Sequence, residues 1–136
     1  MARHHAGIDA LLADARSRLS RITPTQAWRE VCEGTARLVD IRPAAQRAAE
    51  GEVAGVLDPW VIERNVLEWR LDPRQEASLP GVALGDRVIV ICQEGYTSSL
   101  AADSLRSIGI GRATDVVGGF AAWRDLGLPV ARLRAA

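Results

Sequence analysis

The sequence predicts an α/β protein: a three-layer sandwich with a mostly parallel central sheet flanked by helices, and an extra N-terminal helix. Three observations predict it. The chain has 136 residues, enough for one domain with a core. Residues 88–91 are four consecutive β-branched residues, typical of a strand buried on both faces. Strand-like segments alternate along the chain with segments of helical periodicity, which is the pattern of a parallel sheet.

The composition is that of a globular protein and argues against several classes of partner. Apolar residues make up 48% of the chain and charged residues 25%. The 17 basic and 17 acidic residues give zero net charge, so we expect no nucleic-acid partner and no membrane partner. The N-terminal residues lack the apolar run of a secretory signal, which predicts a cytoplasmic protein with reduced cysteines.

The first predicted helix lies within residues 1–20, which we expect to form a helical extension ahead of a domain of residues 21–136. Apolar residues recur there at helical spacing and predict one buried face. The apolar positions are Ile8, Leu11, Leu12, Ala15 and Leu19. We expect this helix to pack outside the main sheet.

A second helix is predicted directly after Thr23. Proline follows at the first helical position and Gln26 stands three residues on, which is the pattern of a capping box. Gly34 is placed to end this helix. Cys32 lies on it, and we expect a small buried hydrophobic residue there, because free cysteines are usually buried.

The middle of the chain predicts one strand, two helices and a long connection. Residues 36–42 are typical of a strand, and residues 43–50 of a short helix that ends before a glycine. Asp58, followed by proline, supplies the N-cap of a further helix. Residues 72–86 are rich in proline and glycine and predict a connection. The Asp58 helix is expected to bury Ile62, Val66 and Trp69 and to pair Arg64 with Glu68 on its outer side.

Cys92 directly follows the buried strand at residues 88–91 and precedes a short loop and a helix that begins near Ser98. In such sheets ligands bind at the carboxyl ends of the strands, where we expect Cys92. Loop amides and the free N–H groups of the helix can point at an anion, and a thiolate is such an anion. Residues 114–117 predict a last strand, and a glycine pair then begins a last helix.

The sequence restricts the chemistry of a thiol at this position. The only histidines are His4 and His5, in a segment expected to fray, which is a poor place for the imidazole base of a cysteine hydrolase. No cluster of ligands has metal-binding spacing, so we expect no metal and no cofactor. If Cys92 is a nucleophile, its activation comes from amides, the helix terminus and an arginine. That suits attack on a soft, already electrophilic sulfur.

The sequence leaves two questions open. Cys92 is either a nucleophile or a structural cysteine at the end of a strand. Asp40 and Arg42 close the neighbouring strand, and they either brace the Cys92 loop or form an ordinary ion pair at a buried edge.

Four segments resemble the signatures of the rhodanese-like family of single-domain sulfurtransferases. They are VDIR at residues 39–42, GEVAGV at 51–56, VICQEGYTS at 90–98, and GGFAAW followed by GLPV within 118–130. The resemblance spans most of the chain but not its first 20 residues. It implies the rhodanese fold and an enzyme similar to thiosulfate sulfurtransferase.

By this resemblance Cys92 is the catalytic residue, which takes a sulfane sulfur as a persulfide and passes it on. The donor would be thiosulfate, mercaptopyruvate or a persulfide, and the acceptor a thiol, cyanide or a protein. Asp40 and Arg42 would be supporting residues. The substrate would be held by the backbone of the loop residues Gln93, Glu94, Gly95, Tyr96, Thr97 and Ser98.

The chain departs from the family's pattern at three places. Glu52 stands where the second signature usually has histidine. Gln93 and Glu94 follow the cysteine where loops that favour thiosulfate carry cations, which makes thiosulfate an unfavourable donor. Tyr96 adds a bulky ring at the loop tip, where it would shape the entrance, dock a partner or simply lie half exposed. Candidates for the missing positive charge are Arg64, Arg70 and Arg74.

Two other functions compete with sulfur transfer. A non-catalytic binding or regulatory module would keep the fold and use the Tyr96 loop to contact a protein. An oxyanion hydrolase or reductase would need a further cation, because related phosphatases and arsenate reductases use a loop one residue longer that ends in arginine. Here Thr97 and Ser98 occupy that region, and the six-residue loop from Cys92 to Thr97 has the length found in sulfurtransferases.

Overall fold

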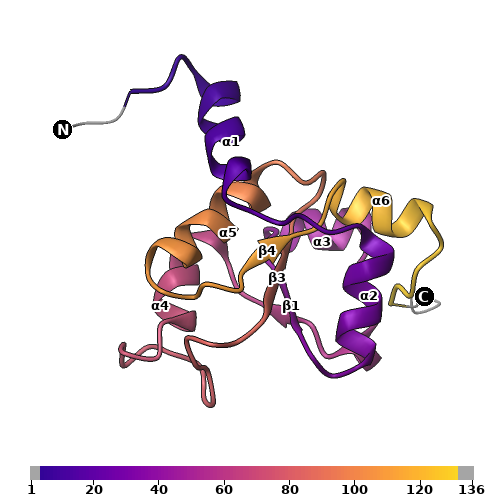
Figure 1. Ribbon diagram of the computed structural model, residues 1–136. Helices are drawn as coiled ribbons and strands as arrows, with labels where there is room; N and C mark the ends of the chain where they lie inside the picture. Colours follow the sequence, from indigo (N-terminus) through magenta and orange to yellow (C-terminus); the bar gives the residue numbers. More distant parts are fainter. Residues whose placement is uncertain (1–3, 132–136) are drawn as a thin grey trace.

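The centre of the structure is a parallel sheet of four strands in the order β2-β1-β3-β4. The computed structural model describes residues 4–131 and is shown in Figure 1. In the central pair, Arg37 of β1 lies opposite Val88 of β3, and Asp40 opposite Ile91. The strands are β1 (Arg37–Asp40), β2 (Trp60–Val61), β3 (Val88–Ile91) and β4 (Thr114–Asp115).

Helices cover both faces of the sheet, which confirms the predicted three-layer sandwich. Each face has its own hydrophobic cluster. One cluster includes α4 (Leu67–Leu71) and α5 (Thr97–Ser107), and the other includes α2 (Pro24–Cys32) and α6 (Gly119–Asp125). The remaining helices are α1 (Ile8–Ser17), α3 (Ala44–Glu50), η1 (Gly55–Leu57) and η2 (Arg64–Val66). No helix within residues 4–131 is long and apolar enough to cross a lipid bilayer.

Successive side chains of strand β3 point alternately into the two hydrophobic clusters. Val88 and Val90 belong to the cluster with α4 and α5, whereas Ile89 and Ile91 belong to the cluster with α2 and α6. All four side chains are buried, which confirms the predicted strand. Burying one such side chain contributes about 1.5–3 kcal/mol. β3 is therefore a firmly packed base for the residue that follows it, Cys92.

Helix α2 has the predicted cap, but one of its residues lies on an unexpected face. Thr23 is the N-cap and accepts a hydrogen bond from the Gln26 amide at 3.1 Å. Cys32 is exposed, so the prediction that it is buried is wrong. Ala27 and Val31 lie one turn apart on the face that packs on the core. The next residue, Cys32, is rotated about 100° from that face, because an α-helix has 3.6 residues per turn.

The segment after Asp58 differs from the predicted helix. It forms strand β2 beside β1, and α4 begins only at residue 67. Pairing with β2 satisfies backbone groups at the free edge of β1, which outweighs the local helix signal. Val66 and Trp69, predicted to be buried, are 40% and 55% exposed. The expected ion pair between Arg64 and Glu68 is present at 2.9 Å. The buried residues of the segment are Ile62, Leu67 and Leu71.

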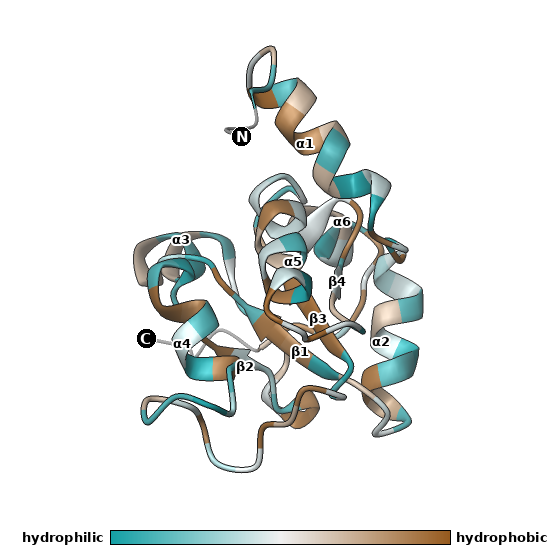
Figure 2. Cartoon of the chain, turned by 60° about the vertical axis from the view of Figure 1, so that its left-hand side comes forward, coloured by the Kyte–Doolittle hydropathy of each residue, from teal (hydrophilic) through white to brown (hydrophobic). Residues whose placement is uncertain are grey.

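Helix α1 projects from the layered body and is attached to it near its C-terminal end (Figure 2). Ala15 is buried, and Arg18 makes two hydrogen bonds of 2.7 Å to the Asp103 carboxylate on α5. Ile8 and Leu11, predicted to be buried, are 63% and 38% exposed, because the first turns extend away from the body. The division into an extension of residues 1–20 and a domain of residues 21–136 stays a prediction.

Candidate active site

Cys92 lies at the carboxyl end of β3, where the loop to α5 begins. The residue is only 4% exposed. Its Sγ accepts hydrogen bonds from the backbone N–H groups of Gly95 at 3.2 Å and Ser98 at 3.3 Å. Two amides of the loop therefore face the sulfur, an arrangement that stabilises a negative charge on it.

The start of α5 provides one of these two amides. The helix begins at Thr97, so the Ser98 N–H belongs to its first turn. First-turn N–H groups have no partner within their own helix, and the helix dipole adds partial positive charge there. Cys92 Sγ thus lies at the N-terminus of a helix, a position where proteins often bind anions. The sequence predicted this position, because a helix was expected to begin just after the loop.

The start of α6 holds the backbone of the same loop. The Phe120 N–H donates to the Cys92 carbonyl at 2.8 Å, and the Ala121 N–H to the Gln93 carbonyl at 2.9 Å. These bonds direct two loop carbonyls toward α6. Gly119 makes this approach feasible, since its φ is +60° and a Cβ there would lie 2.5 Å from the Cys92 carbonyl oxygen.

Replacing Gly95 with alanine is expected to deform the loop. Gly95 has a φ of +86°, and an added Cβ would lie 2.7 Å from the Gly118 amide nitrogen. We expect Gly95→Ala to lower the free energy of unfolding by about 1–3 kcal/mol, the usual cost of a strained backbone position. The displaced amide should also slow alkylation of Cys92 by iodoacetamide.

Chemical denaturation and alkylation in a Cys32→Ser background measure the two effects of Gly95→Ala. Gly85→Ala is the matched control, because an added Cβ at Gly85 meets nothing within 4 Å. If both glycine variants are alkylated as fast as the parent, the Gly95 amide does not activate the thiol.

Asp40 and Arg42 form a buried ion pair beside the loop. Arg42 Nη2 lies 2.7 Å from Asp40 Oδ2, and Arg42 Nε donates to Asp40 Oδ1 at 3.0 Å. Arg42 also donates to the Gln93 side-chain oxygen at 3.0 Å and to the Gly51 carbonyl at 2.9 Å. The pair is therefore buried and also contacts the loop, so the two interpretations drawn from the sequence are compatible.

A second ion pair at the loop was not predicted from the sequence. Asp115 on β4 is fully buried and accepts hydrogen bonds from the Ser98 and Ser99 hydroxyls at 2.7 and 2.8 Å. Arg21 donates to the two carboxylate oxygens at 2.9 and 3.1 Å. One signal did exist: a carboxylate inside a predicted buried strand needs hydrogen-bond partners.

A cavity of about 400 Å³ opens over Cys92. Its walls come from the loop and from residues at the start of α3 and just before it. Glu94 and Tyr96 are exposed here, and Tyr96 as a whole residue is 61% exposed. Gly95 and Ser98 do not line the cavity and contribute only their amides. The lining residues are Ile41, Arg42, Pro43, Gln46, Cys92, Gln93, Glu94, Tyr96 and Thr97.

The charge of this cavity differs from what the sequence suggested. Among the residues that line the cavity, the positively charged one is Arg42. The Arg42 guanidinium donates hydrogen bonds to Asp40, Gln93 and Gly51. The three arginines suggested as a source of positive charge do not line it. Their partners are Glu68 for Arg64, the Ala77 carbonyl for Arg70 and Asp72 for Arg74.

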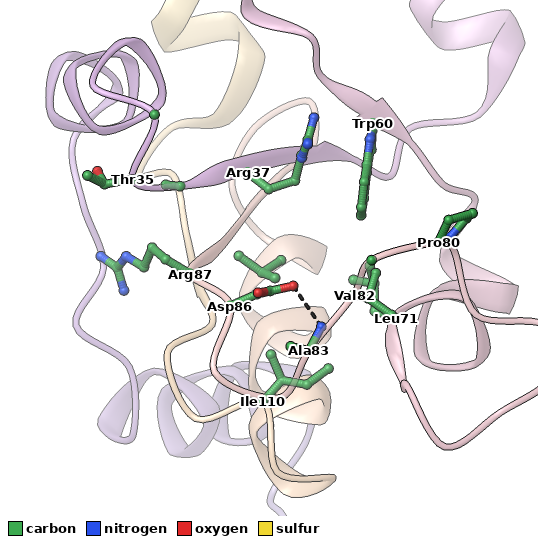
Figure 3. A pocket seen from close by; sticks show the side chains of 14 residues that line it. Thr35, Arg37, Trp60, Leu71, Pro80, Val82, Ala83, Asp86, Arg87 and Ile110 are labelled. Carbon is green, nitrogen blue, oxygen red and sulfur yellow. Dashed lines mark hydrogen bonds between the residues drawn. The ribbon is translucent and has the colours of Figure 1, made fainter.

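A second cavity, of about 390 Å³, lies at the opposite ends of the strands, near the starts of β1 and β3 (Figure 3). No cysteine or histidine is among the described residues that line it. Its charged side chains already have partners. Asp86 accepts from the Ala83 amide, Arg37 pairs with Asp58, and Arg87 pairs with Glu30. The two cavities are similar in size, but among their lining residues only the one over Cys92 contains a cysteine thiol.

The fold and the loop together define an α/β domain with a buried cysteine whose sulfur accepts hydrogen bonds from two loop amides. The chain belongs to the rhodanese-like domain family, whose sequence model matches residues 23–126. Two proteins of Zea mays, both named adenylyltransferase and sulfurtransferase (MOCS3-2 and MOCS3-1), are 35% and 36% identical over 86 and 90 residues. These matches cover 63% and 65% of this chain but only 17% and 18% of the maize proteins.

Solved structures share the fold. A protein of unknown function from Rhodopseudomonas palustris, named a possible tyrosine phosphatase, has a TM-score of 0.82 at 28% identity, covering 96% of this chain and 98% of its own. The human single-domain sulfurtransferase TSTD1 has a TM-score of 0.63 at 25% identity, covering 77% and 95%. The polysulfide-sulfur transferase of Wolinella succinogenes, at 24% identity and a TM-score of 0.74, covers 91% and 87% and shows the fold alone.

Proposed function

We propose that this protein is a sulfurtransferase in which Cys92 carries sulfur as a persulfide. The observation that carries the proposal is the pair of hydrogen bonds from the Gly95 and Ser98 amides to Cys92 Sγ, at 3.2 and 3.3 Å. Membership of the rhodanese-like family and the names of the two maize relatives support it.

The reaction has two displacement steps, each of which conserves electrons. The Cys92 thiolate attacks the sulfane sulfur of a donor persulfide, a new S–S bond forms, and the donor's S–S bond breaks with its electron pair leaving on the donor thiolate. An acceptor thiolate or cyanide then attacks the outer sulfur, and the electron pair of the Cys92 S–S bond returns to Sγ. Both leaving groups are stable anions, so the steps need no imidazole acid and no cofactor.

The loop amides serve both steps. Negative charge lies on Sγ before the first attack and returns to it in the second. Donors fixed in place before the reaction stabilise such charge without reorganising during it. In this mechanism the Gly95 and Ser98 amides are binding groups, whereas Cys92 is the catalytic residue.

The charge at the cavity favours a donor less negative than thiosulfate. Glu94 lines the entrance, and the nearby Arg42 is already paired with Asp40. A dianion would therefore meet a carboxylate and no free cation among the lining residues that the structure describes. We propose a persulfide or mercaptopyruvate as the donor and a small thiol, cyanide or a protein thiol as the acceptor. With mercaptopyruvate, the bond that breaks in the first step is the C–S bond, and its electron pair leaves as the enolate of pyruvate, which takes up a proton from water.

The geometry does not favour an oxyanion hydrolase or reductase. Such enzymes of this fold grip the oxyanion with an arginine at the end of the loop. Ser98 lies in that region, and its hydroxyl donates to Asp115 at 2.7 Å. The loop therefore offers amides to a substrate and no guanidinium.

Intact-mass measurement tests the proposal. Wild type and Cys32→Ser are incubated with a persulfide donor, mercaptopyruvate and thiosulfate in parallel. We expect both proteins to gain one sulfur that cyanide removes and that peptide mapping assigns to Cys92, with thiosulfate as the slowest donor. If none of the three donors produces the adduct, the protein is not a persulfide carrier, and the non-catalytic module is the better hypothesis.

A further inference from the structure

Two arginines hold the carbonyl oxygen of Gly95, in the middle of the loop. Arg16 Nη2 donates to it at 2.7 Å and Arg21 Nη2 at 2.9 Å. Arg16 lies on α1, and Arg21 lies between α1 and α2. Both therefore precede residues 23–126, which the family's sequence model matches. Neither arginine lines the cavity over Cys92.

The direction of this carbonyl determines where the next amide points. The peptide bond between Gly95 and Tyr96 is trans, so the Gly95 carbonyl and the Tyr96 N–H point in opposite directions. Glycine allows its neighbouring peptide planes to rotate more freely than any other residue does. Two hydrogen bonds to charged donors remove that freedom, since bonds of this kind are about twice as strong as neutral ones.

We propose that Arg16 and Arg21 are positioning residues of the loop: they hold the Gly95 carbonyl outward so that the Tyr96 N–H faces the sulfur carried by Cys92. The proposal rests on the function proposed above, because the anion to be held is the thiolate or the persulfide of Cys92. It gives α1 a role in the active site. The Tyr96 amide becomes a third donor beside those of Gly95 and Ser98.

The contacts of Arg16 fit this role. Its Nε donates to the Ser99 hydroxyl at 3.0 Å, and its guanidinium lies over the Tyr96 ring, 5.8 Å from the centroid. One side chain of α1 thus contacts the Gly95 carbonyl, the Tyr96 ring and the first turn of α5. Arg21 shares the Gly95 carbonyl while its other bonds go to Asp115.

These arginines also place positive charge behind the loop. The group contains two guanidiniums and one carboxylate, that of Asp115, so it carries one net positive charge. The sequence suggested Arg64, Arg70 or Arg74 as the source of positive charge near the loop. In the structure Arg16 and Arg21 provide it. Because neither arginine lines the cavity, this charge attracts an anionic sulfur group at the loop without occupying the cavity.

Arg16→Ala in a Cys32→Ser background tests the proposal with the full chain. We expect two rates to fall about tenfold: alkylation of Cys92 by iodoacetamide at neutral pH, and sulfur loading from a persulfide donor. This is the lower end of the loss seen at metal sites when a residue that hydrogen-bonds to a metal ligand is replaced. Added methylguanidine should restore part of the rate. Arg18→Ala is the matched control, because Arg18 holds α1 to Asp103 without contacting the loop.

The outcomes separate this proposal from the proposed function. An unchanged alkylation rate in Arg16→Ala, or equal losses in Arg16→Ala and Arg18→Ala without rescue by methylguanidine, overturns the positioning role. If wild type takes sulfur from no donor but only Arg16→Ala is alkylated slowly, sulfur transfer is wrong and the positioning role stands. Should Arg16→Ala fail to fold by circular dichroism, Arg16→Gln is subjected to the same measurements.

Discussion

Replacing Cys92 with serine is expected to reduce sulfur transfer by about 10⁴-fold or more, the effect of losing the nucleophile in enzymes with covalent intermediates. A serine hydroxyl is not ionised near neutral pH and forms no persulfide. The loop would keep its shape, because serine differs from cysteine by one atom and accepts the same two amide hydrogen bonds. Steady-state transfer from a persulfide donor to cyanide measures the loss.

Two control measurements show whether the loss in Cys92→Ser is due to the missing thiol. Cys32→Ser should transfer sulfur at the wild-type rate, because Cys32 is exposed at the end of α2 and does not line the cavity over Cys92. The free energy of unfolding of Cys92→Ser should lie within about 1 kcal/mol of the wild-type value, because the two amide hydrogen bonds are kept. Transfer by Cys92→Ser at more than a hundredth of the wild-type rate would mean that sulfur moves without a covalent intermediate on this residue.

The sequence predicted those parts of the fold that local signals determine. The run of β-branched residues at 88–91 became a strand buried on both faces, and Thr23 became the N-cap of α2. The segment after Asp58 was mispredicted because its outcome depended on a distant partner. Its helix signals are local, whereas its pairing with β1 depends on an edge that only the folded sheet provides.

The same distinction applies to the candidate site. Cys92 and the amides around it lie within one short segment, so strand and helix rules predicted their arrangement. Arg16 contacts Gly95 across 79 residues of sequence, and Arg21 contacts Asp115 across 94. No periodicity or short motif connects such positions. Arg16 and Arg21, which the sequence analysis did not single out, are therefore identified as neighbours of the loop only by the structure.

Asp40→Ala is expected to destabilise the protein by about 3–5 kcal/mol, the usual cost of leaving a buried charge without its partner. Arg42 is 1% exposed, and its remaining side-chain partners among residues 4–131 would be the Gln93 oxygen, the Gly51 carbonyl and the Phe120 ring, whose centroid lies 4.1 Å away. Those neutral partners do not compensate the guanidinium charge. Chemical denaturation measures the loss.

A double variant distinguishes loss of the ion pair from simple loss of packing. Asp40→Ala combined with Arg42→Met removes the unpaired guanidinium charge and keeps a side chain of similar volume. The double variant should therefore lose less free energy of unfolding than Asp40→Ala alone. Glu50→Ala is the surface control, because Glu50 pairs with Arg124 where both are about 40% exposed, and we expect a change within about 1 kcal/mol. If the double variant is less stable than Asp40→Ala, the Arg42 side chain stabilises the fold through its own contacts. The unpaired charge on Arg42 would then not be the cause of the loss in Asp40→Ala. Because Arg42 also bonds to Gln93, a stable double variant with slowed sulfur loading would separate the structural part of this pair from its effect on the loop.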